Sequence, residues 1–299
     1  MTKVLVTGGN GFFGGRLVPA LQEQYDVVAP SREECDLTSE TAVATLFEKE
    51  KPAIVVHLAA DLGGIGYVRT HPGSVFYNNL MMNTLVLEYA RRHNVQKFIG
   101  ISTVNAYPGD ATAPFAEEQL HDGIPDEDMI GYGLAKRLLI THSQLYHKQY
   151  GFPAVNVLLD SIYGPGDVFV DGKMRVIPAN IRRFIEASGD VVAWGSGKPE
   201  RDFVYVDDAV RAVLFALEHL DTPDPVNIGT GSPVTIKELV ETIASLTGFT
   251  GTISWDTTKP DGQMQRYLST KKAASLGFQT KTTLQDGLQR TIAWYKTTY

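Results

Sequence analysis

Apolar and polar positions follow two different periods along the first half of the chain. Short apolar runs of strand length lie at residues 4–7, 26–29, 54–59, 97–102 and 154–159. Longer segments with apolar residues at helical spacing lie between them, at residues 16–24, 38–50, 72–94 and 130–150. The run at 54–59 is almost wholly apolar, which is typical of a strand covered on both faces. The pattern therefore predicts alternating strands and helices.

Repeated strand–helix units with short links predict an α/β fold with a Rossmann-like, doubly wound parallel sheet and right-handed crossovers. The regular alternation of strand and helix patterns ends after Tyr163-Gly164-Pro165-Gly166, where glycine, proline and aspartate become frequent. We predict an NADP-binding domain over residues 1–162 and a smaller C-terminal α/β substrate domain over residues 163–299. The segment 203–220 has a strand-then-helix pattern and is expected to return to the first domain. Further amphipathic helices are predicted at 235–247 and 283–295.

Composition and charge narrow the classes of function. The 299 residues are 43% hydrophobic, and the net charge of −7 argues against general affinity for nucleic acid or anionic membranes. No apolar run approaches the roughly 20 residues of a membrane-spanning helix, and the N-terminus enters a strand without a signal peptide. The single cysteine, Cys35, cannot form an internal disulfide, and the seven histidines lack metal-ligand spacing. We therefore expect a cytoplasmic protein without a metal site.

Three glycines stand between the first strand and the first helix, in the pattern Gly8-x-x-Gly11-x-x-Gly14. Glycine allows the backbone to approach a pyrophosphate closely, and the N-terminus of the following helix attracts negative charge. This context predicts a dinucleotide site. Its expected residues come from the turn, from the loop after the second strand and from the end of the third strand: Gly8, Asn10, Gly11, Phe12, Phe13, Gly14, Ser31, Arg32, Asp36, Leu37, Ala59 and Ala60. Tyr132 and Lys136, further along the chain, are expected to contact the cofactor as well.

The tip of the second strand bears on the choice of cofactor. NAD enzymes usually carry Asp or Glu there, where the carboxylate accepts hydrogen bonds from the ribose. This chain reads Ala29-Pro30-Ser31-Arg32, and both Ser31 and Arg32 can donate to a 2′-phosphate. We therefore predict NADPH/NADP as the cofactor, while Glu33 and Glu34, which follow directly, leave NAD open.

Proton chemistry is expected from three residues further along the chain. Tyr132 and Lys136 are four residues apart in a predicted helix and so share one face. A nearby ammonium stabilises phenolate, so the tyrosine can exchange a proton with a substrate oxygen, and the lysine can also hold the cofactor ribose. Thr103 ends the fourth strand, at the edge where parallel sheets bind ligands. Ser102 is a competing hydroxyl, although its side chain would face the other side of the strand.

At these residues the chain resembles the extended short-chain dehydrogenase/reductase family, and within it the GDP-L-fucose synthases. The resemblance covers nearly the whole chain. Besides the glycine turn and Tyr132–Lys136, it includes Ala59-Ala60-Asp61-Leu62-Gly63-Gly64-Ile65, Tyr107-Pro108, Tyr163-Gly164-Pro165, Val176-Ile177-Pro178, Trp194-Gly195-Ser196-Gly197, Val206-Asp207-Asp208, Asn227–Gly231 and Lys259–Gly262. It implies an NADPH-dependent enzyme acting on a nucleotide-linked sugar, and a homodimer packed through the two long helices.

The same resemblance implies a substrate site. Arg201 matches an arginine that binds the substrate diphosphate, and Arg266 lies near a basic residue with the same purpose. Val176 and Trp194 match positions that line the nucleotide site. The full set of expected substrate-binding residues is Asn105, Ser161, Arg175, Val176, Trp194, Arg201 and Arg266.

Two departures from the fucose synthases bear on the reaction. Those enzymes move protons at C3 and C5 of the sugar with a cysteine and a histidine, and the matching positions here are Asn105 and Arg175. Asparagine cannot exchange a proton usefully, and arginine stays protonated. We therefore predict an NADPH-dependent 4-ketoreductase without C3/C5 epimerisation. The resemblance suggests a GDP-linked substrate, either a 6-deoxyhexose or a heptose.

Three alternatives stay open. Glu117, Glu118 and His121 lie in the 108–128 loop beside the expected site, and they would allow epimerisation if they replaced the missing acid and base. A second alternative is a 4-epimerase or dehydratase that holds NAD tightly and recycles it, and NAD bound to the purified protein without net oxidation would favour it. A dinucleotide-sensing protein without turnover would keep the fold, although the intact catalytic residues argue against it.

Overall fold

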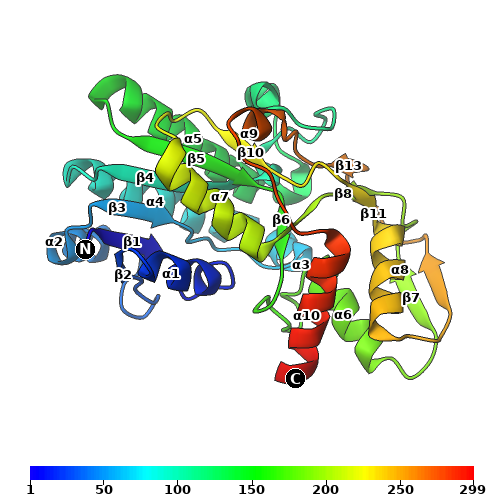
Figure 1. The fold of residues 1–299 in the computed structure, drawn as a ribbon. Coiled ribbons are helices and arrows are strands. Elements are labelled where there is room, and N and C mark those ends of the chain that lie inside the picture. The colour runs from blue at the N-terminus through cyan, green and yellow to red at the C-terminus, as the bar shows by residue number, and fades with distance from the viewer.

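The computed structural model describes residues 1–299, apart from the side chain of Ile65. Its centre is a six-stranded sheet in the order β10-β5-β4-β3-β1-β2, in which all neighbours are parallel (Figure 1). The strands are β1 (Lys3–Thr7), β2 (Asp26–Val28), β3 (Ile54–His57), β4 (Lys97–Thr103), β5 (Ala154–Leu159) and β10 (Val226–Ile228). The predicted parallel α/β fold is confirmed.

Helices cover both faces of this sheet (Figure 1). One face packs against α1 (Gly14–Gln22) and α7 (Val206–His219). The other packs against α2 (Glu40–Glu50), α4 (Pro72–Arg92) and α5 (Ile130–Tyr150). Along β1, Val4 and Val6 belong to one buried apolar cluster and Leu5 to the other. Burial on both faces explains why the strands are apolar at successive positions.

Local signals in the sequence set several helix ends. Ser39 caps α2 by accepting a hydrogen bond from the N–H of Ala42 at 3.4 Å. Thr235 and Glu238 form a reciprocal capping box at the start of α8 (Ile236–Thr247). α5 ends where Gly151 takes a φ of 66°, a left-handed conformation that glycine adopts without strain. These signals explain why the predicted bounds of the three helices lie close to the observed ones.

The C-terminal part of the chain builds three small sheets beside the central one (Figure 1). They pair β6 (Ser161–Tyr163) with β9 (Phe203–Tyr205), β7 (Val191–Trp194) with β12 (Ile253–Asp256), and β8 (Glu200–Arg201) with both β11 (Val234–Thr235) and β13 (Gln265–Arg266). The helix α8 packs against both α6 (Val176–Glu186) and α10 (Leu284–Thr298). A short helix, α9 (Lys271–Ser275), contacts β10.

Two late segments join the central sheet. α7 packs on β4 and β5, and the segment 203–220 forms a strand and then a helix, although its strand, β9, pairs with β6 outside the central sheet. β10 pairs with β5 as the outermost strand, and the sequence analysis missed it. With three residues, of which the central one is the polar Asn227, β10 offers too little pattern to detect. The division of the chain into domains at residues 162 and 163 stays a prediction.

Short helical segments complete the chain: α3 (Ile65–Thr70), η1 (Val104–Ala106), η2 (Glu117–His121) and η3 (Glu127–Met129). η1 follows β4 directly, and it therefore holds Asn105 close to Thr103. None of the described helices combines the length and the apolar character that crossing a membrane requires.

Candidate active site

The glycine turn connects β1 to α1 by a closely packed backbone. Gly8 has a φ of 71°, and a Cβ atom there would lie 2.8 Å from the backbone nitrogen of Ala59. A Cβ atom on Gly14 would lie 2.4 Å from the carbonyl oxygen of Gly8, whereas one on Gly11 would lie 3.4 Å from the same oxygen. Packing inside the turn therefore requires Gly8 and Gly14. Gly11 has no comparable clash among the described atoms, which suits close approach by a ligand.

The first N–H groups of α1 are largely engaged within the turn, because Gly15 donates to the carbonyl oxygen of Gly11 at 2.7 Å and Arg16 donates to that of Phe13 at 3.1 Å. The helix begins at Gly14, and the preceding Phe13 offers no side-chain cap. The helix dipole favours an anion at this end. Phe13 is buried in the core, so only its backbone can serve a ligand, whereas Asn10 and Gly11 are exposed and Phe12 is half-buried. The turn thus fits the pyrophosphate of a dinucleotide.

The loop after β2 holds the residues that bear on the choice between NADP and NAD. Ser31 donates its backbone N–H to the Glu34 carboxylate at 2.7 Å, and its hydroxyl accepts the N–H of Glu34 at 3.3 Å. Glu34 is therefore engaged inside the loop. The side chain of Arg32 is exposed. This arrangement favours the 2′-phosphate of NADP over the ribose hydroxyls of NAD.

The other expected cofactor residues differ in how open they are. Asp36 is exposed and accepts from the N–H of Thr38 at 2.9 Å, while Leu37 is buried in the core. Ala59 lies against Gly8 and is 7% exposed, whereas Ala60 is exposed. Leu37 and Ala59 are thus wall residues, and Asp36 and Ala60 remain available for contact.

α5 and β4 bring the three expected catalytic residues to one part of the structure. The Lys136 ammonium, from α5, donates to the carbonyl oxygen of Ile101 in β4 at 3.0 Å. Thr103 is the last residue of β4, and Tyr132 lies about one helical turn before Lys136. Lys136 is 2% exposed and Tyr132 is 6% exposed. The structure therefore places Lys136 against β4, two residues before Thr103, and Tyr132 on the preceding turn of α5.

Ser102 and Thr103 differ in what their hydroxyls contact. Ser102 is buried, and its hydroxyl donates to the carbonyl oxygen of Lys136 at 3.3 Å. Thr103 is half-buried, and its hydroxyl accepts from the backbone N–H and the side-chain amide of Asn105, at 3.3 and 3.2 Å. Successive residues of a strand face opposite sides, as expected. Thr103 is therefore the better candidate for contact with substrate.

Burial sets the charge state of Tyr132 and Lys136. It lowers the pKa of Lys136 to about 8 and raises the pKa of Tyr132 to about 12, because desolvation disfavours the charged form. The positive charge of Arg175 opposes the rise at Tyr132. At neutral pH the Tyr132 hydroxyl is therefore protonated and able to donate.

Two arginines lie side by side in one small sheet. Arg201 of β8 and Arg266 of β13 are register partners in a parallel pair. Arg201 is 9% exposed and donates to the carbonyl oxygen of Glu200 at 2.7 Å, while Nε of Arg266 is buried without a hydrogen-bond partner in the described structure. Burial and the neighbouring Arg266 lower the pKa of Arg201 to about 9. The pair fits an anionic ligand such as a diphosphate.

Two buried acids near these arginines were missed in the sequence. Asp160 follows β5 and accepts from the N–H groups of Ser161 at 2.8 Å and Leu268 at 3.1 Å. Burial and the nearby Asp202 raise the pKa of Asp160 to about 8. Asp202 follows Arg201 and accepts from the N–H of Thr230 at 2.6 Å. An acid directly after an apolar strand was the available signal for Asp160.

Arg175 connects the C-terminal part of the chain to the glycine turn. It immediately precedes α6 and donates to both carboxylate oxygens of the buried Asp167, at 2.9 Å each. Its guanidinium lies 5.6 Å from the centre of the Phe12 ring. Val176, the first residue of α6, is half-buried beside it. Arg175 is thus a fixed cation, and Asp167, which fixes it, is a further residue that the sequence analysis missed.

Ser161 and Trp194 lie in different surroundings. Ser161 is half-buried and donates its N–H to Asp160, the buried acid that lies near the arginine pair. Trp194 ends β7, is 68% exposed, and has the Lys259 ammonium 5.8 Å from its ring centre. No described contact joins Trp194 to Thr103, so its predicted role in nucleotide binding stays a prediction.

The loop that carries the alternative acid and base groups is anchored to β10. Glu117 accepts the backbone N–H of Asn227 at 2.9 Å, and burial raises the pKa of Glu117. Burial also lowers the pKa of His121, and Glu118 is exposed. Because Glu117 has a structural partner, this loop offers weak support for relocated epimerisation groups.

Comparison with known proteins agrees with this geometry. Residues 4–229 match the NAD dependent epimerase/dehydratase family. The chain belongs to this family. Within the NAD dependent epimerase/dehydratase family, GDP-L-fucose synthase 1 of Arabidopsis thaliana is 38% identical over 299 residues, which cover 98% of this chain and 93% of the relative.

Two solved structures resemble this family member over nearly its whole length. A GDP-6-OMe-4-keto-L-xylo-heptose reductase from C. jejuni has a TM-score of 0.94 at 28% identity, covering 100% of this chain and 98% of that one. A GDP-mannoheptose C4 reductase from Campylobacter jejuni with NADP bound has a TM-score of 0.91 at 28% identity, covering 99% and 98%. The predictions of the family, of an NAD(P)-dependent enzyme and of its fold are confirmed, and the predicted NADPH agrees with these relatives.

Proposed function

We propose that the protein uses NADPH to reduce the 4-keto group of a GDP-linked sugar, a 6-deoxyhexose or a heptose, without epimerising C3 or C5. The observation that carries this proposal is a contrast within the site. Tyr132 and Lys136 keep groups that can exchange protons, whereas Asn105 and Arg175 carry an amide and a guanidinium held by other residues. The reductase titles of the two similar structures support the same reaction class.

The reduction needs a proton at the carbonyl oxygen as well as a hydride at C4. Bound NADPH supplies the hydride. Tyr132, protonated at neutral pH because burial raises its pKa to about 12, donates the proton to the oxygen. The Lys136 cation stabilises the phenolate that Tyr132 then becomes. Thr103 donates a hydrogen bond to the same substrate oxygen, where negative charge develops.

Epimerisation would need a base to remove a proton next to the carbonyl and an acid to return it to the other face. The Asn105 amide has no proton to give near neutral pH. Arg175 keeps its proton and is bound to both oxygens of Asp167 at 2.9 Å. Protons at C3 and C5 are therefore expected to stay in place during turnover.

The diphosphate is the part of the substrate that Arg201 and Arg266 would bind. The two guanidinium groups are register neighbours, and the described ion pairs include neither of them. Bidentate hydrogen bonding to phosphate is the usual role of arginine at such a site. Val176 and Trp194 are proposed to contact the nucleoside end, as the resemblance implies.

We also propose a homodimer packed through α4 and α5. Tyr77 of α4 is 57% exposed, and Leu138 and Leu145 of α5 are 41% and 56% exposed. A hollow of about 200 Å³ between the two helices is lined by Leu80, Leu138 and Leu145 among others. An apolar face of this kind on two adjacent helices suits the same face of a second copy.

The test is turnover of purified protein with NADPH and either a GDP-4-keto-6-deoxyhexose or a GDP-4-keto-heptose. We expect one NADPH oxidised for each sugar reduced at C4, and loss of this reaction in the Tyr132→Phe variant. The proposal is wrong if neither sugar is reduced and the purified protein carries bound NAD that it recycles without net oxidation.

A further inference from the structure

A continuous chain of hydrogen bonds joins the arginine pair to the Thr103 hydroxyl. Nη1 of Arg266 donates to Oδ1 of Asn105 at 3.1 Å. Nδ2 of Asn105 donates to Oγ1 of Thr103 at 3.2 Å, and the backbone N–H of Asn105 donates to the same oxygen at 3.3 Å. Arg266 and Asn105 are 161 residues apart in the chain, so only the fold brings these groups together.

The chemistry of the three side chains fixes the direction of every bond in this chain. A guanidinium has donors and no acceptor, so the amide of Asn105 must turn its oxygen toward Arg266. The Nδ2 group of Asn105 then faces Thr103, whose hydroxyl oxygen must accept the hydrogen bond. Since the oxygen of Thr103 already accepts two hydrogen bonds from Asn105, its own hydrogen is free to donate elsewhere.

Neighbouring contacts hold Asn105 in place. A Cβ atom on Gly133 would lie 2.2 Å from the carbonyl oxygen of Asn105, so η1 packs directly against α5 beside Tyr132. Nε of Arg137 donates to the carbonyl oxygen of Ala106 at 2.7 Å and fixes the next residue. The backbone of Asn105 is therefore held in place, and its side-chain amide is hydrogen-bonded to Arg266 and Thr103.

We propose that Asn105 is a positioning residue, which directs the hydroxyl hydrogen of Thr103 toward the substrate carbonyl oxygen. Arg266 in turn sets the orientation of the Asn105 side-chain amide. This inference rests on the proposed ketoreductase function. It gives Asn105 a role in the reduction itself, at the position where it departs from the fucose synthases. It also links the residue that would bind the diphosphate to the residue that would bind the carbonyl oxygen.

Asn105→Ala and Asn105→Asp test this role by their effect on kcat. Alanine frees the Thr103 hydroxyl to rotate, and aspartate, which only accepts, draws the hydrogen away from the substrate. We expect kcat to fall about 10-fold in Asn105→Ala and about 100-fold in Asn105→Asp, within the range for loss of one oriented donor. In a Thr103→Val background, Asn105→Ala should change kcat by less than about twofold, because the group it orients is gone.

Gln265→Glu is the matched control for the added negative charge. Gln265 neighbours Arg266 in β13, is exposed, and contacts Glu200 instead of Asn105. It should leave kcat within about twofold, as an exposed charge acts weakly. An equal loss of kcat from Asn105→Ala with and without Thr103 would show a merely structural role and overturn the proposal.

A second measurement does not depend on turnover. In protein labelled with ¹⁵N-asparagine, the side-chain amide signals of Asn105 are identified by their loss in Asn105→Ala. We expect their hydrogens to exchange with water more slowly than those of the exposed Asn94, and their signals to move in Thr103→Val but not in Gln265→Glu. Exchange as fast as at Asn94, or no response to Thr103→Val, would contradict the arrangement. A protein with this amide behaviour but no reductase activity would refute the proposed function alone.

Discussion

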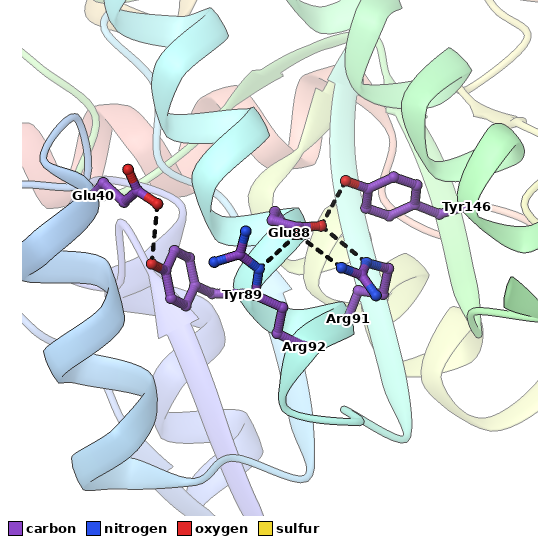
Figure 2. Close-up of polar contacts among 6 residues, drawn as sticks. All are labelled: Glu40, Glu88, Tyr89, Arg91, Arg92 and Tyr146. Carbon is purple, nitrogen blue, oxygen red and sulfur yellow. Dashed lines mark hydrogen bonds and ion pairs between the residues drawn. The ribbon is translucent and has the colours of Figure 1, made fainter.

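Two groups of cations in this molecule differ in what neutralises them. At the end of α4, Glu88 accepts from Arg91 at 2.9 and 2.8 Å, from Arg92 at 2.6 Å and from the Tyr146 hydroxyl at 2.6 Å (Figure 2). These partners, Arg91 above all, lower the pKa of Glu88 to about 2 against the burial that would raise it. The carboxylate thus satisfies both arginines within the protein.

The cations at the candidate site have neutral partners instead. Lys136 donates to the carbonyl oxygen of Ile101, Arg201 to that of Glu200, and Arg266 to the amide oxygen of Asn105. Buried cations whose described hydrogen bonds go to neutral acceptors cost stability, and they remain available to a negatively charged ligand. Arg175 lies at the same site but has Asp167, which agrees with a fixed charge that moves no proton. The difference separates binding cations from structural ones.

The largest expected effect comes from removing the most buried of these cations. Lys136→Met should lower kcat by about 10²- to 10⁴-fold, the range of general acid–base catalysis. The same change should raise the free energy of unfolding at pH 7 by about 1–3 kcal/mol, because a desolvated charge is removed. Turnover and denaturant unfolding measure the two effects. A variant less stable than the parent protein would break the comparison.

The pH dependence of stability sharpens this prediction. The pKa of Lys136 is about 8 in the folded protein against an ordinary value of 10.5. The unfolded chain therefore binds more protons at this group between those values, so its contribution to stability rises with pH across that window. The Lys136→Met variant should lack this part of the rise, and an unchanged slope would contradict the assignment.

Removing one arginine of the pair should weaken substrate binding. Arg201→Gln is expected to raise KM about 10- to 100-fold, the equivalent of one or two charge-assisted hydrogen bonds to phosphate. Arg92→Gln, at the cluster in Figure 2, is the matched control and should leave KM within about twofold. Steady-state kinetics at several salt concentrations measures both variants. Similar KM values for the two would remove the distinction between the groups.

Activity should fall at alkaline pH through the same lysine. As the pH rises through about 8, Lys136 loses its proton, and with it the charge that stabilises the Tyr132 phenolate in the proposed mechanism. We expect kcat/KM to fall by up to about tenfold for each pH unit above this value. In Lys136→Arg the guanidinium stays charged, so the remaining kcat/KM should not fall as the pH rises above 8. If kcat/KM of the Lys136→Arg variant still falls above pH 8, another group is responsible for the alkaline loss of activity.

The smallest effect is expected at the satisfied cluster. Glu88→Gln should lower the free energy of unfolding by about 1–2 kcal/mol and leave kcat unchanged, since the cluster contacts no candidate site residue. The pKa of Glu88 in the folded protein is below its ordinary value of 4.5. The stability that Glu88 contributes is therefore fully present above pH 4.5 and is lost as the pH falls toward about 2. Thermal unfolding at neutral and acidic pH measures this loss, and a large fall in kcat would contradict it.

The sequence was a good guide where the structure is local. α5 spans Ile130–Tyr150 as predicted, because its apolar spacing is regular and Gly151 ends it. β10 was missed because three residues of mixed polarity carry no period. Its place in the sheet depends on pairing with β5, more than sixty residues away. Pairing at such separation leaves no pattern in one sequence.

In the candidate site, too, some residues could be predicted from local spacing, whereas others depend on contacts between distant segments. Motif spacing pointed to Thr103, Tyr132 and Lys136, and in the structure Lys136 of α5 contacts β4 two residues before Thr103. The contact of Arg266 with Asn105, and the buried acid Asp160, depend on β13 lying beside β8. That placement arises from the fold of the C-terminal part, which local spacing does not encode.

The central claim is reduction at C4 without proton exchange at C3 or C5, and turnover in heavy water tests it most directly. The protein, NADPH and a GDP-4-keto-6-deoxyhexose are incubated in heavy water, and the product is analysed by mass and by NMR. We predict a sugar reduced at C4 with no carbon-bound deuterium, because Asn105 and Arg175 cannot exchange protons. Deuterium at C3 or C5 in the product would contradict the account.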